Sequence, residues 1–430
     1  MAKDTSVAVE QASSGVGGSR NAIGEGLLQI EDRSDATCND DWSRWWQSFL
    51  RGAQLPNARD ARKLRCVDLF CGAGGFALGA SLAARGANRR PRFERIVDAD
   101  GRALGVHANS LDVGRSINSG VSSLVDYQIR RRGGGAHFSY TPEVVDPALE
   151  IEPNVDLLIA GPPCQGHSNL NNHTRRSDPR NDLLICTVAT AVALRAKVVI
   201  IENVRTVTVS HGDVVGMARE LFEASGYLVN EDIVRADLLG WPQTRERYFM
   251  TAVRQDAVRA DLPPIKTRES KSVLWAISDL MDLSGAREPF DTAPVPSAEN
   301  RSRIDWLFKN DEYNLDNAER PDCHKDGTTY TAVYGRMFGD RPAPTITTGI
   351  GTPGQGRFIH PLRRRLITPH EAARIQGFPD GYAFMDEEGK ATRKALAKWI
   401  GDAVPSSMGF EIVRRALASV GIAELSSVEP

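Results

Sequence analysis

A cysteine in a proline-rich corner is the side chain best placed for chemistry in this chain. The stretch AGPPCQGHSNLNN covers residues 160–172 and places Cys164 directly after Pro162 and Pro163. The two prolines fix the backbone on the approach, so the thiol should project from a stiff corner into a cleft. A lone cysteine is more often buried and inert. A nucleophilic role requires nearby cations, or amides at a helix start, to lower the thiol pKa from its usual value of ~8.5.

A glycine-dense turn gives a second chemical signal. The octapeptide DLFCGAGG runs from Asp68 to Gly75, and its last four residues form a turn where backbone can approach a ligand and offer free amides. Asp98 ends the next predicted strand, and its carboxylate suits the diol of a ribose. NAD and S-adenosylmethionine (AdoMet) both carry such a ribose, so these residues leave both cofactors open. A plain strand–helix turn with a surface aspartate is the alternative without function.

Apolar runs that alternate with helical patterns indicate the scaffold for these residues. Strands are predicted at Arg65–Phe70, Arg95–Ala99, Val155–Ala160, Val198–Glu202 and Tyr248–Val253, and helices at Phe76–Ala84, Leu183–Leu194 and Val214–Ser225. Strands separated by crossover-length helices predict an α/β fold with a doubly wound, mostly parallel sheet. Ligands bind such sheets at the carboxyl ends of the strands. The glycine turn, Asp98, the cysteine corner and Glu202 all follow strands, so we expect them along one rim.

The outer segments have other compositions. Residues 1–60 are expected to form a loosely ordered leader with one short amphipathic helix in DWSRWWQSFL, whose tryptophans cover the main core. The polar region from about Leu262 to His360 predicts a second, smaller domain with short β-like pieces such as TTYTAVYGRMF at 328–338. The helical pattern after residue 393 should return the chain to the main sheet.

Composition narrows the class of protein. The 430 residues are 41% hydrophobic and 25% charged, close to the globular average, and no apolar run approaches the ~20 residues that span a bilayer. The first residues do not form a signal peptide, so we expect a cytoplasmic protein without membrane contact. The six cysteines lack CxxC pairing, and we expect no metal. The net charge of −2 is weak evidence against nucleic acid, because affinity depends on where cations cluster.

Taken together, the motifs resemble the DNA (cytosine-5) methyltransferases. The resemblance spans about Arg65 to Gly421 and follows six segments in order: DLFCGAGGF at 68–76, GPPCQGHS at 161–168, ENV at 202–204, QTRERYF at 243–249, RLITPHEAARIQGFPD at 365–380 and GDAVP at 401–405. One short match could arise by chance, but six in this order could not. It implies a Rossmann-like AdoMet-dependent methyltransferase sheet with a target-recognition domain. The implied divisions are a leader at 1–60, a catalytic domain at 61–262, the recognition domain and hinge at 263–387, and a C-terminal segment at 388–430 that completes the catalytic domain.

The resemblance assigns a role to each catalytic candidate. Cytosine C5 is a poor nucleophile, and a thiolate that adds to C6 turns the ring into an enamine-like species that can accept a methyl group. By resemblance Cys164 is that nucleophile and Glu202 contacts N3 of the base. Arg245 and Arg247 match arginines that hold O2 of the base and orient the acid. As alternatives, Glu202 could be a capping carboxylate and the arginines a salt-bridged edge.

The cofactor and DNA contacts are implied in the same way. The implied AdoMet contacts are Phe70, Gly72, Ala73, Gly75, Asp98, Pro163, Leu183, Asp402 and Val404. Asp98 stands where the family more often has Glu, and Asp402 stands where Asn is commoner. The family's acidic residue for the adenine amino group is not located, because residues 111–153 align poorly. The implied DNA contacts lie in the loop after the nucleophile, at Gln165, Ser168, Arg175, Arg176 and Arg180.

The function expected is therefore methylation of C5 in a cytosine that is rotated out of double-stranded DNA. Sequence choice should rest in Leu262–Ile359, with side chains that read base edges in the major groove. We expect a monomer associated with the nucleoid, with a cognate restriction endonuclease as a partner in a modification system. Three alternatives stay open: a tRNA cytosine-5 methyltransferase, a non-catalytic DNA-binding protein of the same fold, and an NAD-type oxidoreductase.

Overall fold

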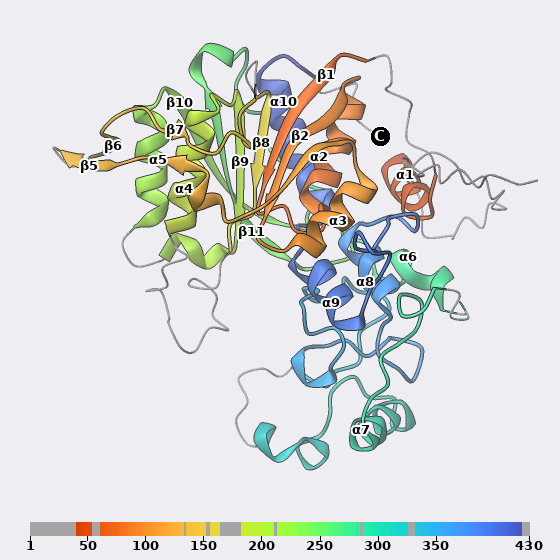
Figure 1. The fold of residues 1–430 in the computed structure, drawn as a ribbon. Coiled ribbons are helices and arrows are strands. Elements are labelled where there is room, and N and C mark those ends of the chain that lie inside the picture. The colour runs from red at the N-terminus through yellow and green to blue at the C-terminus, as the bar shows by residue number, and fades with distance from the viewer. Residues whose placement is uncertain are drawn as a thin grey trace, which may run out of the picture.

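A seven-stranded sheet lies at the centre of the fold (Figure 1). The computed structural model describes residues 40–53, 61–132, 135–151, 155–163, 182–209, 213–281, 283, 287–325 and 332–423. The strand order is β10-β11-β9-β8-β1-β2-β3. The strands are β1 (Lys63–Leu69), β2 (Arg90–Asp98), β3 (Val113–Asn118), β8 (Leu157–Ala160), β9 (Val198–Asn203), β10 (Tyr227–Arg235) and β11 (Glu246–Arg254).

Five neighbouring strands of this sheet run parallel. Strands β9, β8, β1, β2 and β3 are parallel, whereas β11 is antiparallel to β9 and to β10. The predicted mostly parallel, doubly wound sheet is confirmed. The five strands predicted from sequence are the five central ones, and the two edge strands β3 and β10 were not predicted.

Helices cover both faces of the sheet because successive residues of the central strands enter opposite apolar layers. In β9, Val198 and Ile200 join one layer, and Val199 and Ile201 join the other. The first layer is completed by α2 (Gly75–Gly86), α3 (Gly101–Ser110) and α10 (Ser406–Ser419), and the second by α4 (Asp182–Ala193) and α5 (Val214–Ala224). The predicted return of the C-terminal segment to the sheet is confirmed by α10. The β-carbon of an alanine at Gly79 would lie 2.4 Å from the Ser406 carbonyl oxygen, so α2 and α10 pack backbone to backbone.

Smaller elements lie beside the sheet. Two short antiparallel pairs follow β3: β4 (Val125–Asp126) with β7 (Glu143–Val144), and β5 (Ile129–Arg132) with β6 (Gly135–Phe138). Single 3₁₀ turns occur at η1 (Val121–Ser123), η3 (Arg205–Val209), η4 (Gln255–Ala257), η5 (Ser278–Leu280), η6 (Asn317–Glu319), η7 (Asp322–His324) and η8 (Pro353–Gln355). Across these described ranges, no helix has both the length and the apolar character needed to cross a membrane.

A second part of the chain extends away from the sheet (Figure 1). Helices α6 (Val273–Ile277), α8 (Pro369–Gln376) and α9 (Arg393–Asp402) lie next to the sheet and form what we call the hinge. Beyond them lies the distal lobe, residues 287–325 and 332–365, which contains α7 (Ala298–Lys309). The β-like pieces predicted at 328–338 were wrong for the described residues of that stretch, which hold only an isolated bridge between Arg336 and Ile359. The lobe instead packs through side chains such as Met337 and Phe358.

The predicted amphipathic helix of the leader is α1 (Asp41–Leu50). Asp40 caps it, because its Oδ1 accepts a hydrogen bond from the Ser43 amide at 2.8 Å. Trp46, Phe49 and Leu50 are buried. The prediction that the tryptophans of this segment cover the main core is confirmed by Trp46, which belongs to the first apolar layer.

Candidate active site

The predicted site residues meet at one edge of the sheet, where the parallel strands β9, β8, β1 and β2 end side by side. Glu202 is the penultimate residue of β9, and Asp98 is the last residue of β2. Gly161 follows β8, and Gly72 follows β1. Neighbouring strands bring these residues together although they are far apart in sequence. The rim predicted from the sequence is confirmed for the glycine turn, Asp98 and Glu202, whereas Cys164 lies outside the described residues.

The glycine turn is held by the carboxylate of Asp98. Its Oδ2 accepts a hydrogen bond from the Gly72 amide at 2.8 Å, and its Oδ1 accepts one from the Asp100 amide at 2.8 Å. A carboxylate can accept about four hydrogen bonds, so both oxygens keep lone pairs for a ligand. Gly72 has φ +49°, and no described atom outside its own chain neighbours lies within 4 Å of where a β-carbon would stand. The turn therefore borders open space beside an anionic group.

The lower side of the turn packs tightly on the C-terminal segment and the hinge. A β-carbon at Gly75 would lie 2.6 Å from the Val404 carbonyl oxygen, which explains why this position has no side chain. The Tyr382 hydroxyl donates to the Ala73 carbonyl at 2.6 Å. Ala73 and Val404 are buried, whereas Phe70 is partly exposed in a left-handed conformation with φ +53°. These contacts fix Ala73 and Gly75 against the rest of the protein, whereas the space beside Gly72 stays open for a ligand.

Two titratable groups are buried under the turn. Nδ1 of His107 lies 3.9 Å from Oδ2 of Asp68, and both side chains are almost completely inaccessible to solvent. Burial, with the nearby charge of Asp98, raises the pKa of Asp68 well above its usual value. Burial lowers the pKa of His107 to about 3. We infer that both groups are neutral and support the turn without charge.

Glu202 forms a buried ion pair with Arg247. Nε of Arg247 lies 2.9 Å from Oε1 of Glu202, and the two side chains are 15% and 11% exposed. The pair arises because β11 runs antiparallel to β9, with Phe249 opposite Glu202. Next to it, Asn203 donates a weak hydrogen bond of 3.4 Å to the Pro162 carbonyl, which ties β9 to the proline corner. The arrangement holds an oriented acid beside the segment that leads into Cys164.

A model of the C-5 cytosine-specific DNA methylase family matches residues 141–418. The chain belongs to this family. The Type II methyltransferase M1.BsuMI of Bacillus subtilis is 38% identical over 85% of this chain and 83% of its own length. The Type II methylase M.HgiDII of Herpetosiphon aurantiacus is 28% identical over 81% of this chain and 93% of its own length.

A solved structure gives the same fold. An Escherichia coli prophage protein, solved as a candidate DNA modification methyltransferase, superposes with a TM-score of 0.57 at 22% identity, over 84% of this chain and all of that one. The predicted fold class, family and enzyme activity are confirmed: the chain is a DNA (cytosine-5) methyltransferase.

The structure separates the two arginines of this methylase that the sequence grouped together. Arg247 holds Glu202, whereas Nη1 of the buried Arg245 donates to the Ile346 carbonyl at 2.8 Å and to the Gly401 carbonyl at 3.3 Å. Arg245 therefore connects the strand β11 region to the distal lobe and to the end of α9. A contact of Arg245 with the base stays a prediction.

Asp402 sits in a charge cluster at the cofactor corner. Nζ of Lys398 lies 3.5 Å from Oδ2 of Asp402 and 3.2 Å from Oδ2 of Asp100. Burial raises the pKa of Asp402, while Lys398 acts in the opposite direction. The charge that Asp402 adds is thus partly offset by a lysine one turn earlier on α9, a residue that sequence reasoning missed. The spacing of four residues on a helix was the available signal.

The end of β3 supplies a further rim residue that was not predicted. Asn118 lies opposite Asp98 in the β2–β3 pair, and its Nδ2 donates to the Asp98 carbonyl at 3.0 Å. The strand carries exposed Arg115 and Ser116, so its sequence lacks the apolar run that marked the central strands. Tyr382 was also missed, because nothing in the sequence connects it with Ala73.

The remaining predictions fall on or near the loop after β8. Pro163 is partly exposed at the end of the described corner, and Leu183 is partly exposed in the first turn of α4. The predicted nucleophile and the predicted DNA contacts lie outside the described residues: Cys164, Gln165, Ser168, Arg175, Arg176 and Arg180.

Proposed function

We propose that this methylase modifies C5 of a cytosine extruded from double-stranded DNA through a covalent bond between Cys164 and C6 of the base. The thiolate adds to C6, C5 takes the methyl group, and loss of the C5 proton then expels the thiolate and restores the aromatic ring. S-adenosylmethionine supplies the electrophilic methyl group when bound. Extrusion of the base costs a few kcal/mol, which contacts with DNA must offset.

The buried pair of Glu202 and Arg247 is the observation that carries this proposal. Thiolate addition to C6 places negative charge on N3 of the ring, and an acid at that position offsets the charge. The ion pair with Arg247, in which Nε lies 2.9 Å from Oε1 of Glu202, restricts the orientation of the carboxyl group before substrate arrives. Preorganised groups of this kind contribute more than groups that must reorient during the reaction. The side chains are far less exposed than those of typical surface ion pairs, so solvent screens them weakly.

The glycine turn fits the cofactor by its chemistry. The open space beside Gly72 admits a ligand close to the backbone, and the lone pairs left on Asp98 can accept hydrogen bonds from ribose hydroxyls. The other proposed contacts, Phe70, Ala73, Gly75, Pro163, Leu183, Asp402 and Val404, come from both ends of the catalytic part of the chain.

We further propose that the enzyme acts in a restriction–modification system. The relatives M1.BsuMI and M.HgiDII carry type II names, and such a system would supply a cognate endonuclease that cuts the unmethylated site. The distal lobe would select the DNA sequence, and the arginines at 175, 176 and 180 would contact phosphates. We propose that the enzyme acts as a monomer on nucleoid DNA.

The test is methyl transfer by Cys164→Ser, with Cys323→Ser as the control. Cys323 is an exposed thiol in the distal lobe, so its substitution should leave the rate unchanged. Bisulfite sequencing of DNA from cells that express the wild type should reveal one methylated motif, and C164S should give none while it still binds DNA. The wild type should also form a covalent complex with DNA that contains 5-fluorocytosine. Full activity of C164S would refute the assigned nucleophile, and label found in tRNA rather than DNA would refute the substrate.

A further inference from the structure

Helix α1 lies outside the part of the chain that matches the family model, which begins at residue 141. It is nevertheless built into the structure. Figure 1 shows it beside α6 and α8, on the side where the hinge meets the sheet. Trp46 is fully buried, and Gln47 is 5% exposed despite its polar side chain. Its buried residues Trp46, Phe49 and Leu50 belong to the first apolar layer, so α1 packs as part of the core.

The apolar face of α1 contacts the catalytic part and the hinge at once. The ring centroid of Trp46 lies 4.8 Å from that of Trp241 and 5.9 Å from that of Phe410 on α10. Trp241 lies 5.7 Å from Trp275 on α6. Trp241 also stands in the segment that leads into β11, where Arg247 holds the catalytic acid. One helix thus packs between the segment that precedes β11, the last helix α10 and the hinge.

Polar bonds fix the end of α1 to the hinge. Nε2 of Gln47 donates to the Trp275 carbonyl at 3.1 Å, and the Asp380 amide donates to the Leu50 carbonyl at 2.9 Å. Nε of Arg51, the residue that ends the helix, lies 3.3 Å from Oδ2 of Asp279. Their side chains are 20% and 35% exposed.

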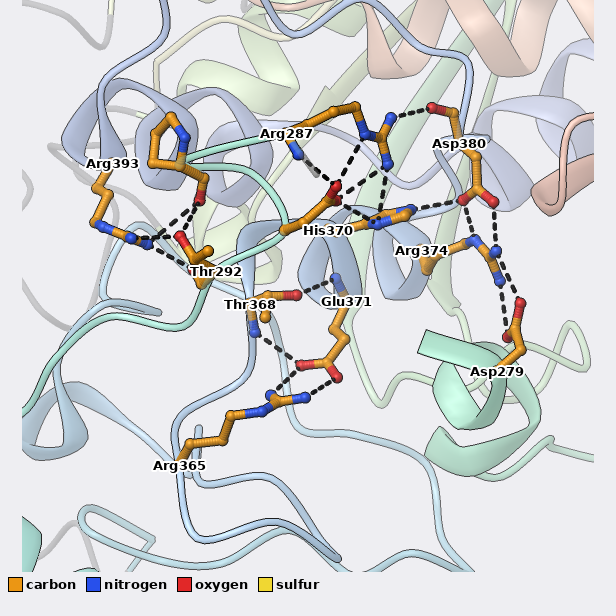
Figure 2. A network of polar contacts seen from close by, with 12 residues as sticks. Asp279, Arg287, Thr292, Arg365, Thr368, His370, Glu371, Arg374, Asp380 and Arg393 are labelled. Carbon is orange, nitrogen blue, oxygen red and sulfur yellow. Dashed lines mark hydrogen bonds and ion pairs between the residues drawn. The ribbon is translucent and has the colours of Figure 1, made fainter. Parts of the chain in front are cut away.

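Arg51 pairs with Asp279. From Asp279 a polar network continues through the hinge (Figure 2). Asp279 accepts from Nη2 of the buried Arg374 at 3.1 Å, and Nη2 of Arg374 also donates to Asp380 at 2.6 Å. Burial alone would raise the pKa of Asp380, but hydrogen bonds from His370 and Arg374 hold it far below its usual value. Asp380 is therefore a permanent anion at neutral pH.

The network then reaches the start of the distal lobe. Nε2 of His370 lies 2.7 Å from Oδ1 of Asp380, and its Nδ1 lies 2.9 Å from Oδ1 of Asp291. Arg287 donates to both Asp291 and the Asp380 carbonyl. Figure 2 shows these side chains converging on α8 from the segment that enters the lobe. Arg374, His370 and Asp291 are almost fully buried, whereas Asp279, Asp380 and Arg287 are partly exposed. The buried members have few alternative partners, so they hold the hinge and the start of the lobe in one arrangement.

We propose that α1 is a brace that sets the orientation of the distal lobe for DNA binding, with Arg51 as a positioning residue that acts through Asp279 and Arg374. The proposal rests on the proposed role of the lobe in DNA recognition. The cofactor turn is held by contacts with Asp98, Val404 and Tyr382, and none of these three residues pairs with Arg51, Asp279 or Arg374 in the described part of the chain. Loss of the brace should therefore weaken DNA binding and leave AdoMet binding intact.

The experiment compares Arg51→Met with Arg44→Met in the full chain. Both substitutions remove one arginine charge from the same helix, but Arg44 pairs with Asp41 in that helix and is 58% exposed. R51M should raise the Kd and KM for a DNA duplex about three- to tenfold, while the kcat at saturating DNA and the Kd for AdoMet change less than twofold. R51K, which keeps the charge, should recover part of the loss. R44M should match the wild type.

Rates of amide hydrogen exchange test the proposed role of α1 independently of catalysis. R51M should speed exchange in residues 273–281 and 369–381 and leave β1 and α2 unchanged. The proposal requires both results, and the absence of either the weaker DNA binding or the local exchange overturns it. An equal loss of AdoMet and DNA affinity would also overturn it, because that result indicates general destabilisation. A wild type that makes no 5-methylcytosine would instead refute the proposed function, and exchange would still decide whether Arg51 orders the hinge.

Discussion

Replacement of Arg247 by methionine removes the group that orients the catalytic acid and keeps most of the side-chain volume. The variant loses the ion pair in which Nε lies 2.9 Å from Oε1 of Glu202, and it loses any hydrogen bond from the guanidinium to the base. A charge-assisted interaction of this kind contributes about 1.5–3 kcal/mol. Two such interactions that strengthen in the transition state would contribute about 3–6 kcal/mol. Because each 1.36 kcal/mol changes the rate about tenfold, we expect kcat to fall at least about 100-fold.

The assay is single-turnover transfer of labelled methyl groups to duplex DNA, at saturating AdoMet and DNA. Calorimetric binding of AdoMet should change less than twofold, because the cofactor turn does not contact Arg247 among the described residues. The control is Arg205→Met. Arg205 lies shortly after β9, the strand that carries Glu202, but its side chain is 63% exposed, and its Nη1 lies 3.1 Å from Oε1 of Glu246. R205M should retain at least a third of the wild-type rate. Equal losses in R247M and R205M, or R247M activity above a third of wild type, would show that the ion pair does not orient the acid.

Two further variants test the cofactor turn, and a third tests the buried His360. Gly72→Ala meets open space but strains a left-handed backbone, so it should cost about 1 kcal/mol of stability and weaken AdoMet binding measured by calorimetry. Gly75→Ala places a methyl group 2.6 Å from the Val404 carbonyl and should lower the free energy of unfolding by about 1–3 kcal/mol in denaturant titrations; a free energy of unfolding equal to that of the wild type would contradict this close packing. Burial lowers the pKa of His360 to about 3. As the pH falls through about 6.5, this histidine therefore takes up a proton in the unfolded chain but stays neutral in the folded chain. Stability should fall by about 1 kcal/mol for this histidine between pH 7.5 and 5.5, and His360→Asn should remove that share of the slope.

The sequence predicted the elements whose surroundings are uniform. Four of the five central strands, β1, β8, β9 and β11, contain continuous buried runs such as VVII in β9, and such runs are enough to find them. In β2 the buried run is only Ile96 and Val97. The edge strands β3 and β10 face solvent along much of their length, and Arg115 in β3 or Asn230 in β10 gives no such run. The failure to find β3 also hid Asn118 at the rim. In the distal lobe, Met337 and Phe358 are buried without regular strands, so a β-like pattern there was misleading.

What the sequence determined by itself is local: the place of Pro162 and Pro163 directly after β8, the glycine turn after β1, and the alternation of strands and helices that brings strand ends to one rim. These features follow from backbone restrictions and side-chain periodicity within a few residues. Only the tertiary structure decided that Arg247 orients Glu202 while Arg245 holds the lobe, that Lys398 offsets Asp402 and Asp100, and that α1 supports the hinge. Each of these contacts joins segments whose meeting depends on sheet register and helix packing. A short stretch of sequence fixes the conformation of its own backbone, but the partner of a charged side chain is chosen by the packing of the whole chain.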